Sequence, residues 1–150
     1  RTIDVEDSLN TMRSMLARTA RAATNGELLG IEGSAAAAYF SCWPELLADS
    51  LDDRMRFGGR TRRPPKDRIN ALISYGYGML YREVLSAIVS VGLHPGIGFY
   101  HQPRTAAHPL ALDLMELFRV PLVDMALLAA VNRRTFDPEA CFTETPGPVL

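Results

Sequence analysis

Residues 67–91 read DRINALISYGYGMLYREVLSAIVSV. Apolar side chains recur in this stretch at intervals of three and four positions, the spacing that brings side chains onto one face of a helix. They are Ile69, Leu72, Ile73, Leu80, Val84 and Ile88. Asp67 stands where it can cap the first turn, and Gly92 stands where such a helix ends. The spacing therefore predicts one long helix over residues 67–91.

Further helices are expected on both sides of this one. Their predicted ranges are residues 5–22, 27–42, 109–118 and 121–130. Asn25 is placed to cap the second of these, and Pro44 either bounds it or begins a short following helix. Pro109 and Pro121 each suit the first turn of a helix. No stretch alternates clearly enough to be a strand, so the expected fold class is all-α.

Length and composition narrow the class of protein. The chain has 150 residues and a net charge of −1, which suits one domain, residues 1–150, and gives no overall sign of a nucleic-acid binder. No run of 18 apolar residues exists, so a membrane span is excluded. Two cysteines without metal-type spacing fit a reducing cytoplasm. The start lacks both Met and an apolar signal core, so a piece of a longer protein is expected.

Positive charge is concentrated in one segment, the basic loop, which covers about residues 52–68. Seven of the 16 basic residues fall within the 15 positions 54–68, namely Arg54, Arg56, Arg60, Arg62, Arg63, Lys66 and Arg68. Paired glycines at 58–59 and prolines at 64–65 indicate an exposed loop, one that orders on binding. A solvated surface loop and a phosphate-binding patch are both open. All but one of the 16 basic residues are Arg, a ratio that by itself favours composition bias.

Two acidic residues stand on the predicted helix 109–118. Asp113 and Glu116 are three positions apart and form the polar sector of a helix that is otherwise apolar nearly all round. Buried carboxylates cost several kcal/mol unless they are paired, hydrogen-bonded or bound to a metal. An ion pair with Arg119 or Arg104 is the alternative to a functional site.

Glu32 and His101 are the other candidates. Glu32 shares a predicted helix face with apolar residues and is flanked by Gly30 and Gly33, which suggests close approach of a backbone or of a ligand. The alternative is a tight helix crossing with Glu32 reaching water. His101 follows a loop rich in glycine and aromatic residues, and an ordinary hydrogen-bonded histidine is its alternative. Glu32, His101 and Glu116 together would suit Mg²⁺ or Mn²⁺.

Four ordered motifs resemble one family. They are GIEGSA at 30–35 followed by Tyr39-Phe40, RTRRPPKDRINALISYGY at 60–77, GLHPGIGFYH at 92–101 and PLALDLMELFR at 109–119. In this order they are similar to the CRISPR-associated adaptation endonuclease, the integrase that inserts new spacers. The resemblance spans residues 30–124, most of the chain.

The resemblance implies a fold and a metal site. The family's catalytic lobe is α-helical and follows a β-rich N-terminal domain, which this sequence lacks. By motif, the ligands of a divalent metal, Mg²⁺ or Mn²⁺, fall on Glu32, His101 and Glu116, and these are also the expected catalytic residues. Asp113 matches a further acidic position that is a candidate ligand. Many relatives have Asp where Glu116 stands and often Ser where Pro109 stands.

The resemblance also implies a reaction and partners. The expected reaction is attack of a DNA 3′-hydroxyl on a phosphodiester at a CRISPR repeat border. The expected DNA contacts are Arg60, Arg62, Arg63, Lys66 and Arg68, with Asn70 and Tyr75 as lesser candidates for contact or support. Expected partners are double-stranded DNA, a second copy of the chain, a small ferredoxin-like adaptation subunit, and a RecB-like iron–sulfur nuclease or a reverse transcriptase. The compartment implied is the prokaryotic cytoplasm.

Two other functions stay open at this point. One is a non-catalytic helical subunit that binds DNA or proteins and uses its acids only in ion pairs. The other is a metal-dependent hydrolase of an unrelated substrate, against which the basic loop argues.

Overall fold

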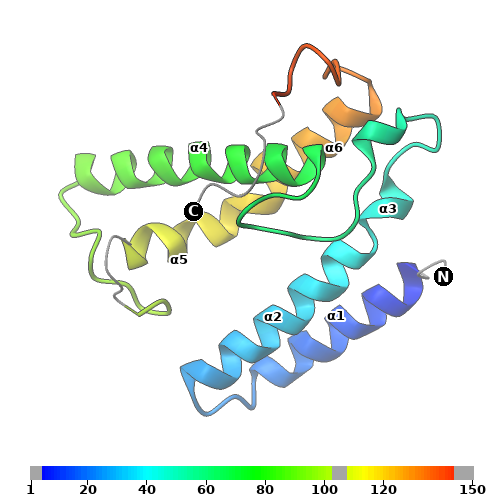
Figure 1. Cartoon of the computed structure of the whole chain (residues 1–150). Coiled ribbons are helices and arrows are strands. Elements are labelled where there is room, and N and C mark those ends of the chain that lie inside the picture. The colour runs from blue at the N-terminus through cyan, green and yellow to red at the C-terminus, as the bar shows by residue number, and fades with distance from the viewer. Residues whose placement is uncertain (1–4, 103–107, 144–150) are drawn as a thin grey trace. The chain divides into compact units, whose positions relative to one another are not determined.

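The computed structural model describes residues 5–102 and 108–143 (Figure 1). The described residues are helical and contain no strand, which confirms the predicted all-α class. In chain order they form α1 (Val5–Thr19), α2 (Asn25–Ser41), α3 (Trp43–Leu46), the 3₁₀ turn η1 (Asp53–Met55), α4 (Arg68–Ser90), α5 (Pro109–Phe118), the π-helical turn η2 (Arg119–Asp124) and α6 (Met125–Asn132). None of these helices is long and apolar enough to cross a bilayer.

The described residues form two compact units. Unit 1 draws on residues 1–70 and 137–150, and unit 2 on residues 71–136, so the boundary falls near the beginning of α4. Unit 1 holds α1 to α3 and the basic loop. Unit 2 holds most of α4 together with α5, η2 and α6.

In unit 1, α1 and α2 lie side by side as a hairpin (Figure 1). The cap of α2 is Thr24, whose hydroxyl accepts the N–H of Glu27 at 3.2 Å, while the Glu27 carboxylate accepts the N–H of Ala23 at 2.7 Å. The prediction that Asn25 caps this helix was wrong by one position. Thr24 and Glu27 satisfy N–H groups at the start of the helix reciprocally, so Asn25 lies within the first turn.

An aromatic cluster forms the core of unit 1. Trp43 is fully buried, and its ring lies 5.4 Å from that of Phe40 and 5.4 Å from that of Phe57. Met55 is also buried. The prediction that the basic loop is simply an exposed loop was therefore wrong in part. Two of its apolar side chains fix the basic loop to the core.

The ends of α4 are capped as predicted. The Asp67 carboxylate accepts the N–H of Asn70 at 2.7 Å, and Gly92 after the last turn has a φ of 79°. Within unit 2, this helix buries Ile73, Leu80 and Ile88. Buried apolar side chains of α5 and α6 complete that core, namely Ala111, Met115, Leu127 and Val131.

Pro121 does not begin a helix, contrary to prediction. It lies inside η2, through which α5 continues into α6. In the widened turn the N–H of Met125 reaches the carbonyl of Val120, five residues back. Proline lacks an N–H and clashes with the carbonyl four residues earlier, so a π-helical turn accommodates it without ending the helix.

Two glycines of α4 give a matched test of this packing. A Cβ at Gly76 would lie 2.6 Å from Cγ1 of Val123, whereas a Cβ at Gly78 would meet no described atom within 4 Å. We expect Gly76→Ala to lower the free energy of unfolding by about 1–3 kcal/mol through overpacking. Gly78→Ala should raise it by up to about 1 kcal/mol through helix propensity. Urea unfolding measures both, and equal effects would contradict the packing of α4 against η2.

Candidate functional site

A buried carboxylate, that of Asp113 on α5, organises the candidate site in unit 2. The residue is 5 % exposed. Its Oδ2 accepts the backbone N–H groups of Phe99 at 2.7 Å and Tyr100 at 3.1 Å, and its Oδ1 accepts that of His101 at 2.8 Å. The segment before α5 is thus held by three backbone hydrogen bonds to one side chain.

The same carboxylate fixes the imidazole of His101. Burial alone would raise the pKa of Asp113, but the hydrogen bonds from the N–H groups of His101 and Tyr100, from the His101 side chain and from Phe99 outweigh it, and the pKa is lowered. An ionised Asp113 can only accept, so Nδ1 of His101, 2.7 Å from Oδ1, is the donor. In the neutral imidazole, Nε2 then carries the lone pair. This is the arrangement of a metal-ligating histidine supported by a carboxylate.

Gly98 explains why the loop before His101 is rich in glycine. A Cβ at this position would lie 2.6 Å from Cβ of Pro109 and 2.8 Å from Oδ2 of Asp113. Only glycine therefore lets the loop approach the first turn of α5 closely enough for its N–H groups to reach Asp113.

Glu116 lies one helical turn beyond Asp113 and is half-buried. Its Oε1 forms an ion pair with Nη1 of Arg119 at 2.5 Å, and the two side chains are 29 % and 22 % exposed. The ion pair that the sequence offered as an alternative is therefore present for Arg119. Arg104 lies outside the described residues.

Glu32 lies on α2 in unit 1 and is half-buried. No described atom would lie within 4 Å of a Cβ at Gly30 or at Gly33. Within unit 1, no helix therefore crosses α2 tightly at these glycines.

The residue types at these positions fit a hard divalent metal. Two carboxylates and an imidazole nitrogen held ready by Asp113 are donors that Mg²⁺ and Mn²⁺ accept. Glu32 belongs to unit 1, whereas His101 and Glu116 belong to unit 2. Within neither unit do the described residues gather three His, Cys, Asp or Glu side chains into a metal-binding group.

Asp113 fits a positioning role better than a ligand role. Both of its oxygens already accept two hydrogen bonds each. A metal ion bound there would have to displace donors that hold the loop.

The basic loop in unit 1 is built around Asn70, which is fully buried. Its Oδ1 accepts the N–H of Thr61 at 2.8 Å and Nη1 of Arg60 at 2.9 Å, and its Nδ2 donates to the carbonyl of Gly59 and to Asp67, both at 2.7 Å. The sequence offered Asn70 either for DNA contact or for support of the site. Its amide is used to shape the loop, which is the supporting role that the sequence also allowed.

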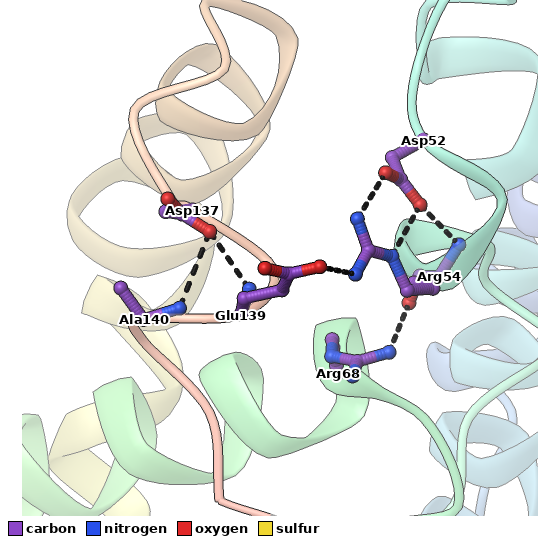
Figure 2. Close-up of polar contacts among 6 residues, drawn as sticks. All are labelled: Asp52, Arg54, Arg68, Asp137, Glu139 and Ala140. Atoms are coloured by element: carbon purple, nitrogen blue, oxygen red, sulfur yellow. Dashed lines mark hydrogen bonds and ion pairs between the residues drawn. The ribbon is translucent and has the colours of Figure 1, made fainter.

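Several cations of the basic loop serve the protein itself. Arg60 donates to the carbonyl of Thr61 and lies 5.8 Å from the ring centre of Phe40. Figure 2 shows Arg54 between Asp52, at 2.7 Å, and Glu139, at 2.8 Å, with Arg68 donating to the Arg54 carbonyl. The Arg54 hydrogen bonds hold the pKa of Asp52 far below its usual range.

Three cations of the basic loop and one tyrosine face solvent. Arg62, Arg63 and Lys66 are exposed, and no ion pair is found for them among the described residues. Tyr75, on α4 in unit 2, is 69 % exposed. These side chains are available to a ligand, whereas Arg60 and Arg68 are partly engaged within the loop.

Two residues near Glu116 were missed by sequence reasoning. The hydroxyl of Tyr77 donates to Oδ1 of Asp124 at 2.9 Å, and Asp124 is 1 % exposed. The Arg119 guanidinium carbon lies 5.0 Å from the ring centre of Tyr77. The sequence contained one indication of this contact. Asp124 is an acid in the strongly apolar run 120–131, and a buried acid requires a partner.

The sequence of the chain is similar to those of known proteins. The family model described as CRISPR associated protein Cas1 matches residues 1–150. A Cas4 exonuclease/Cas1 endonuclease fusion from Myxococcus xanthus is 50% identical over 92% of this chain and 24% of its own length. A Cas1 endonuclease from Thermus thermophilus is 46% identical over 82% of this chain and 38% of its own length.

Solved structures agree with the sequence comparison. A Cas1 protein from Thermotoga maritima has a TM-score of 0.80 at 35% identity, covering 94% of this chain and 49% of that one. A casposase bound to an integration product has a TM-score of 0.77 at 28% identity, covering 95% and 42%.

Fold and site together define a helical module in which a buried carboxylate of α5 holds an imidazole, with a second acid one helical turn further along α5. The chain belongs to the Cas1 family of CRISPR-associated proteins and corresponds to its helical C-terminal lobe. It spans about a quarter of the length of the first two curated relatives.

Burial decides how much the Asp113 carboxylate contributes to stability. We expect Asp113→Asn to lower the free energy of unfolding by about 3–5 kcal/mol, because an amide nitrogen would face buried N–H donors. Asp137 is a matched control, since it accepts the N–H groups of Glu139 and Ala140 in an exposed position (Figure 2). Asp137→Asn should change the free energy of unfolding by less than about 1 kcal/mol. Thermal unfolding compares the two, and a small loss for Asp113→Asn would contradict the site geometry.

Proposed function

We propose that the chain carries the active site of a metal-dependent DNA integrase that inserts new spacers into a CRISPR array. The observation that carries this proposal is the imidazole of His101, held by Asp113 in a chain of the Cas1 family. Similarity to a casposase bound to an integration product supports DNA transfer as the reaction class.

The reaction is a phosphodiester exchange. The 3′-hydroxyl oxygen of the incoming DNA attacks a phosphorus at the repeat border, forming one P–O bond while the bond to the leaving oxygen breaks. The attacking hydroxyl loses a proton and the leaving oxygen gains one, so the exchange is balanced. Water in place of the hydroxyl gives hydrolysis at the same site.

Glu32, His101 and Glu116 hold Mg²⁺ or Mn²⁺ in this proposal, and the bound ion supplies charge stabilisation to the phosphate oxygens. Asp113 keeps Nε2 of His101 as the ligand atom by engaging Nδ1. With both nitrogens used, His101 does not transfer protons. Asp113 is thus a positioning residue rather than a fourth ligand.

DNA binding is assigned mainly to the three exposed cations of the basic loop. Arg62, Arg63 and Lys66 neutralise backbone phosphates, while Arg60 and Arg68 hold the loop in shape and add charge. Tyr75 is retained as a contact because it is exposed.

The partners proposed for the intact protein follow from its relatives. Similar structures include a complex named Cas6-RT-Cas1–Cas2, and similar proteins include Cas4/Cas1 fusions. We propose that this protein acts as a homodimer with a small ferredoxin-like Cas2-type subunit on double-stranded DNA. A RecB-like iron–sulfur nuclease, separate or fused, would work beside it in the prokaryotic cytoplasm.

One observation favours a second candidate, a non-catalytic helical subunit. The Glu116–Arg119 ion pair shows that Glu116 can serve within the protein. A Mn²⁺ titration separates the two functions, because only the enzyme loses its response when Glu116 is replaced.

Removing any one proposed ligand should stop the chemistry but not DNA binding. In the intact protein, we expect Glu32→Gln, His101→Asn and Glu116→Gln each to reduce integration to background, with DNA affinity changed less than about threefold. Gel-based integration assays and filter binding provide the two measurements. Glu83→Gln, at an exposed position of α4, is the control and should remain active. Integration by all three ligand variants would overturn the assignment.

Removing the exposed cations should change the salt dependence of DNA binding. Each lost phosphate contact reduces the log–log slope by about 0.9, so the triple variant Arg62→Ala, Arg63→Ala, Lys66→Ala should reduce it by about 2.7.

The matched control removes the same charge from exposed positions of α1 and the turn that follows it, through Arg13→Ala, Arg18→Ala and Arg21→Ala. Its slope should stay near that of the wild type. Equal slopes in all three proteins would leave the basic loop as a solvated surface.

A further inference from the structure

Arg119 occupies one oxygen of Glu116. Its Nη1 lies 2.5 Å from Oε1, and both side chains are less than a third exposed, so solvent screens this ion pair less than one on the surface. A carboxylate oxygen in an ion pair with a guanidinium is less able to bind a metal ion, because the resident cation must first move away.

The Arg119 side chain makes a second contact, with the ring of Tyr77. Its guanidinium lies 5.0 Å from the ring centre of Tyr77, within the range of a cation–π contact. The hydroxyl of Tyr77 is held by the buried carboxylate of Asp124 at 2.9 Å. Arg119 and Asp124 are the first and last residues of η2, so the π-helical turn brings both to one tyrosine.

One hydrogen-bond donor of the Arg119 guanidinium is left unsatisfied by the described residues in this position. Its Nε atom is buried, and none of the described residues accepts a hydrogen bond from it. The ring of Tyr77 is an uncharged partner, and Glu116 supplies the ion pair. A stronger cation could therefore take Glu116 while the ring keeps Arg119 nearby.

We infer that Arg119 is a resident counter-cation of Glu116 that the catalytic metal ion must displace. This rests on the proposed role of Glu116 as a ligand. Without metal, Arg119 offsets the charge of a half-buried carboxylate. When the metal binds, Arg119 moves off Oε1 and remains on the Tyr77 ring.

Replacement of Arg119 by an uncharged residue should raise the affinity for the metal ion, whereas most substitutions beside a metal site lower it. Loss of this cation should strengthen metal binding, because it removes the positive charge that competes with the metal ion for Glu116. For Arg119→Gln in the intact protein we expect the affinity for Mn²⁺ to rise about three- to tenfold. Arg119→Met, which keeps the length of the side chain over the ring, should show the same rise.

Two controls isolate the effect. Arg119→Lys retains the charge and should remain close to wild type. Arg82→Gln removes a positive charge from an exposed position of α4 and should also leave the affinity unchanged. Free Mn²⁺ measured by electron paramagnetic resonance gives the affinities. Thermal unfolding with and without Mn²⁺ should show a larger metal-induced rise in Tm for Arg119→Gln than for wild type.

The outcomes are separable. If Glu116→Gln weakens Mn²⁺ binding while Arg119→Gln and Arg119→Met leave it unchanged or weaken it, the exchange is overturned and the metal-site proposal stands. If Glu116→Gln has no effect on Mn²⁺ binding, the metal-site proposal fails at Glu116, and the exchange fails with it. A purely structural role for Arg119 would lower Tm equally with and without metal.

Discussion

The carboxylate of Asp113 is the point on which the site in unit 2 depends. Four hydrogen bonds converge on its two oxygens, three from successive backbone N–H groups and one from the His101 ring. They connect the loop before α5 to α5 itself, and they choose the ring nitrogen that His101 can offer. The close approach at Gly98 is a condition of the same arrangement. One buried charge therefore determines both the path of a loop and the chemistry of an imidazole.

The surroundings of Glu116 also depend on a single feature, the π-helical turn η2. The helix continues past Pro121, and the π-helical turn that allows this also brings Arg119 to the ring of Tyr77 and Asp124 to its hydroxyl. The backbone irregularity is thus connected to the electrostatics of the neighbouring acid. Arg119 and Asp124 are five positions apart in the sequence. In a regular α-helix, side chains at this spacing would lie on different faces, where one tyrosine could not contact both.

Local patterns predicted much of the fold. Asp67 and Gly92 bound α4 because capping and positive φ have strong residue preferences, and Pro109 begins α5 for the same kind of reason. The burial of Asn70 and the engagement of Asp113 could not be predicted from the sequence. Both depend on which backbone groups a distant loop brings to the side chain, and spacing along the chain carries no information about that. Pro121 misled because a proline at a helix start and one in a π-helical turn have the same local sequence.

The abundance of arginine in the basic loop also acquires a physical reason. Composition bias was the simplest explanation of the ratio, yet Arg54 makes contacts that need a planar, forked cation. Its Nε and Nη2 donate to the two carboxylate oxygens of Asp52, while its Nη1 donates to Glu139. Lysine has a single nitrogen, so it could not make these three hydrogen bonds together. The charge that the loop can present to DNA is consequently smaller than its residue count implies, because part of it already holds the surface together.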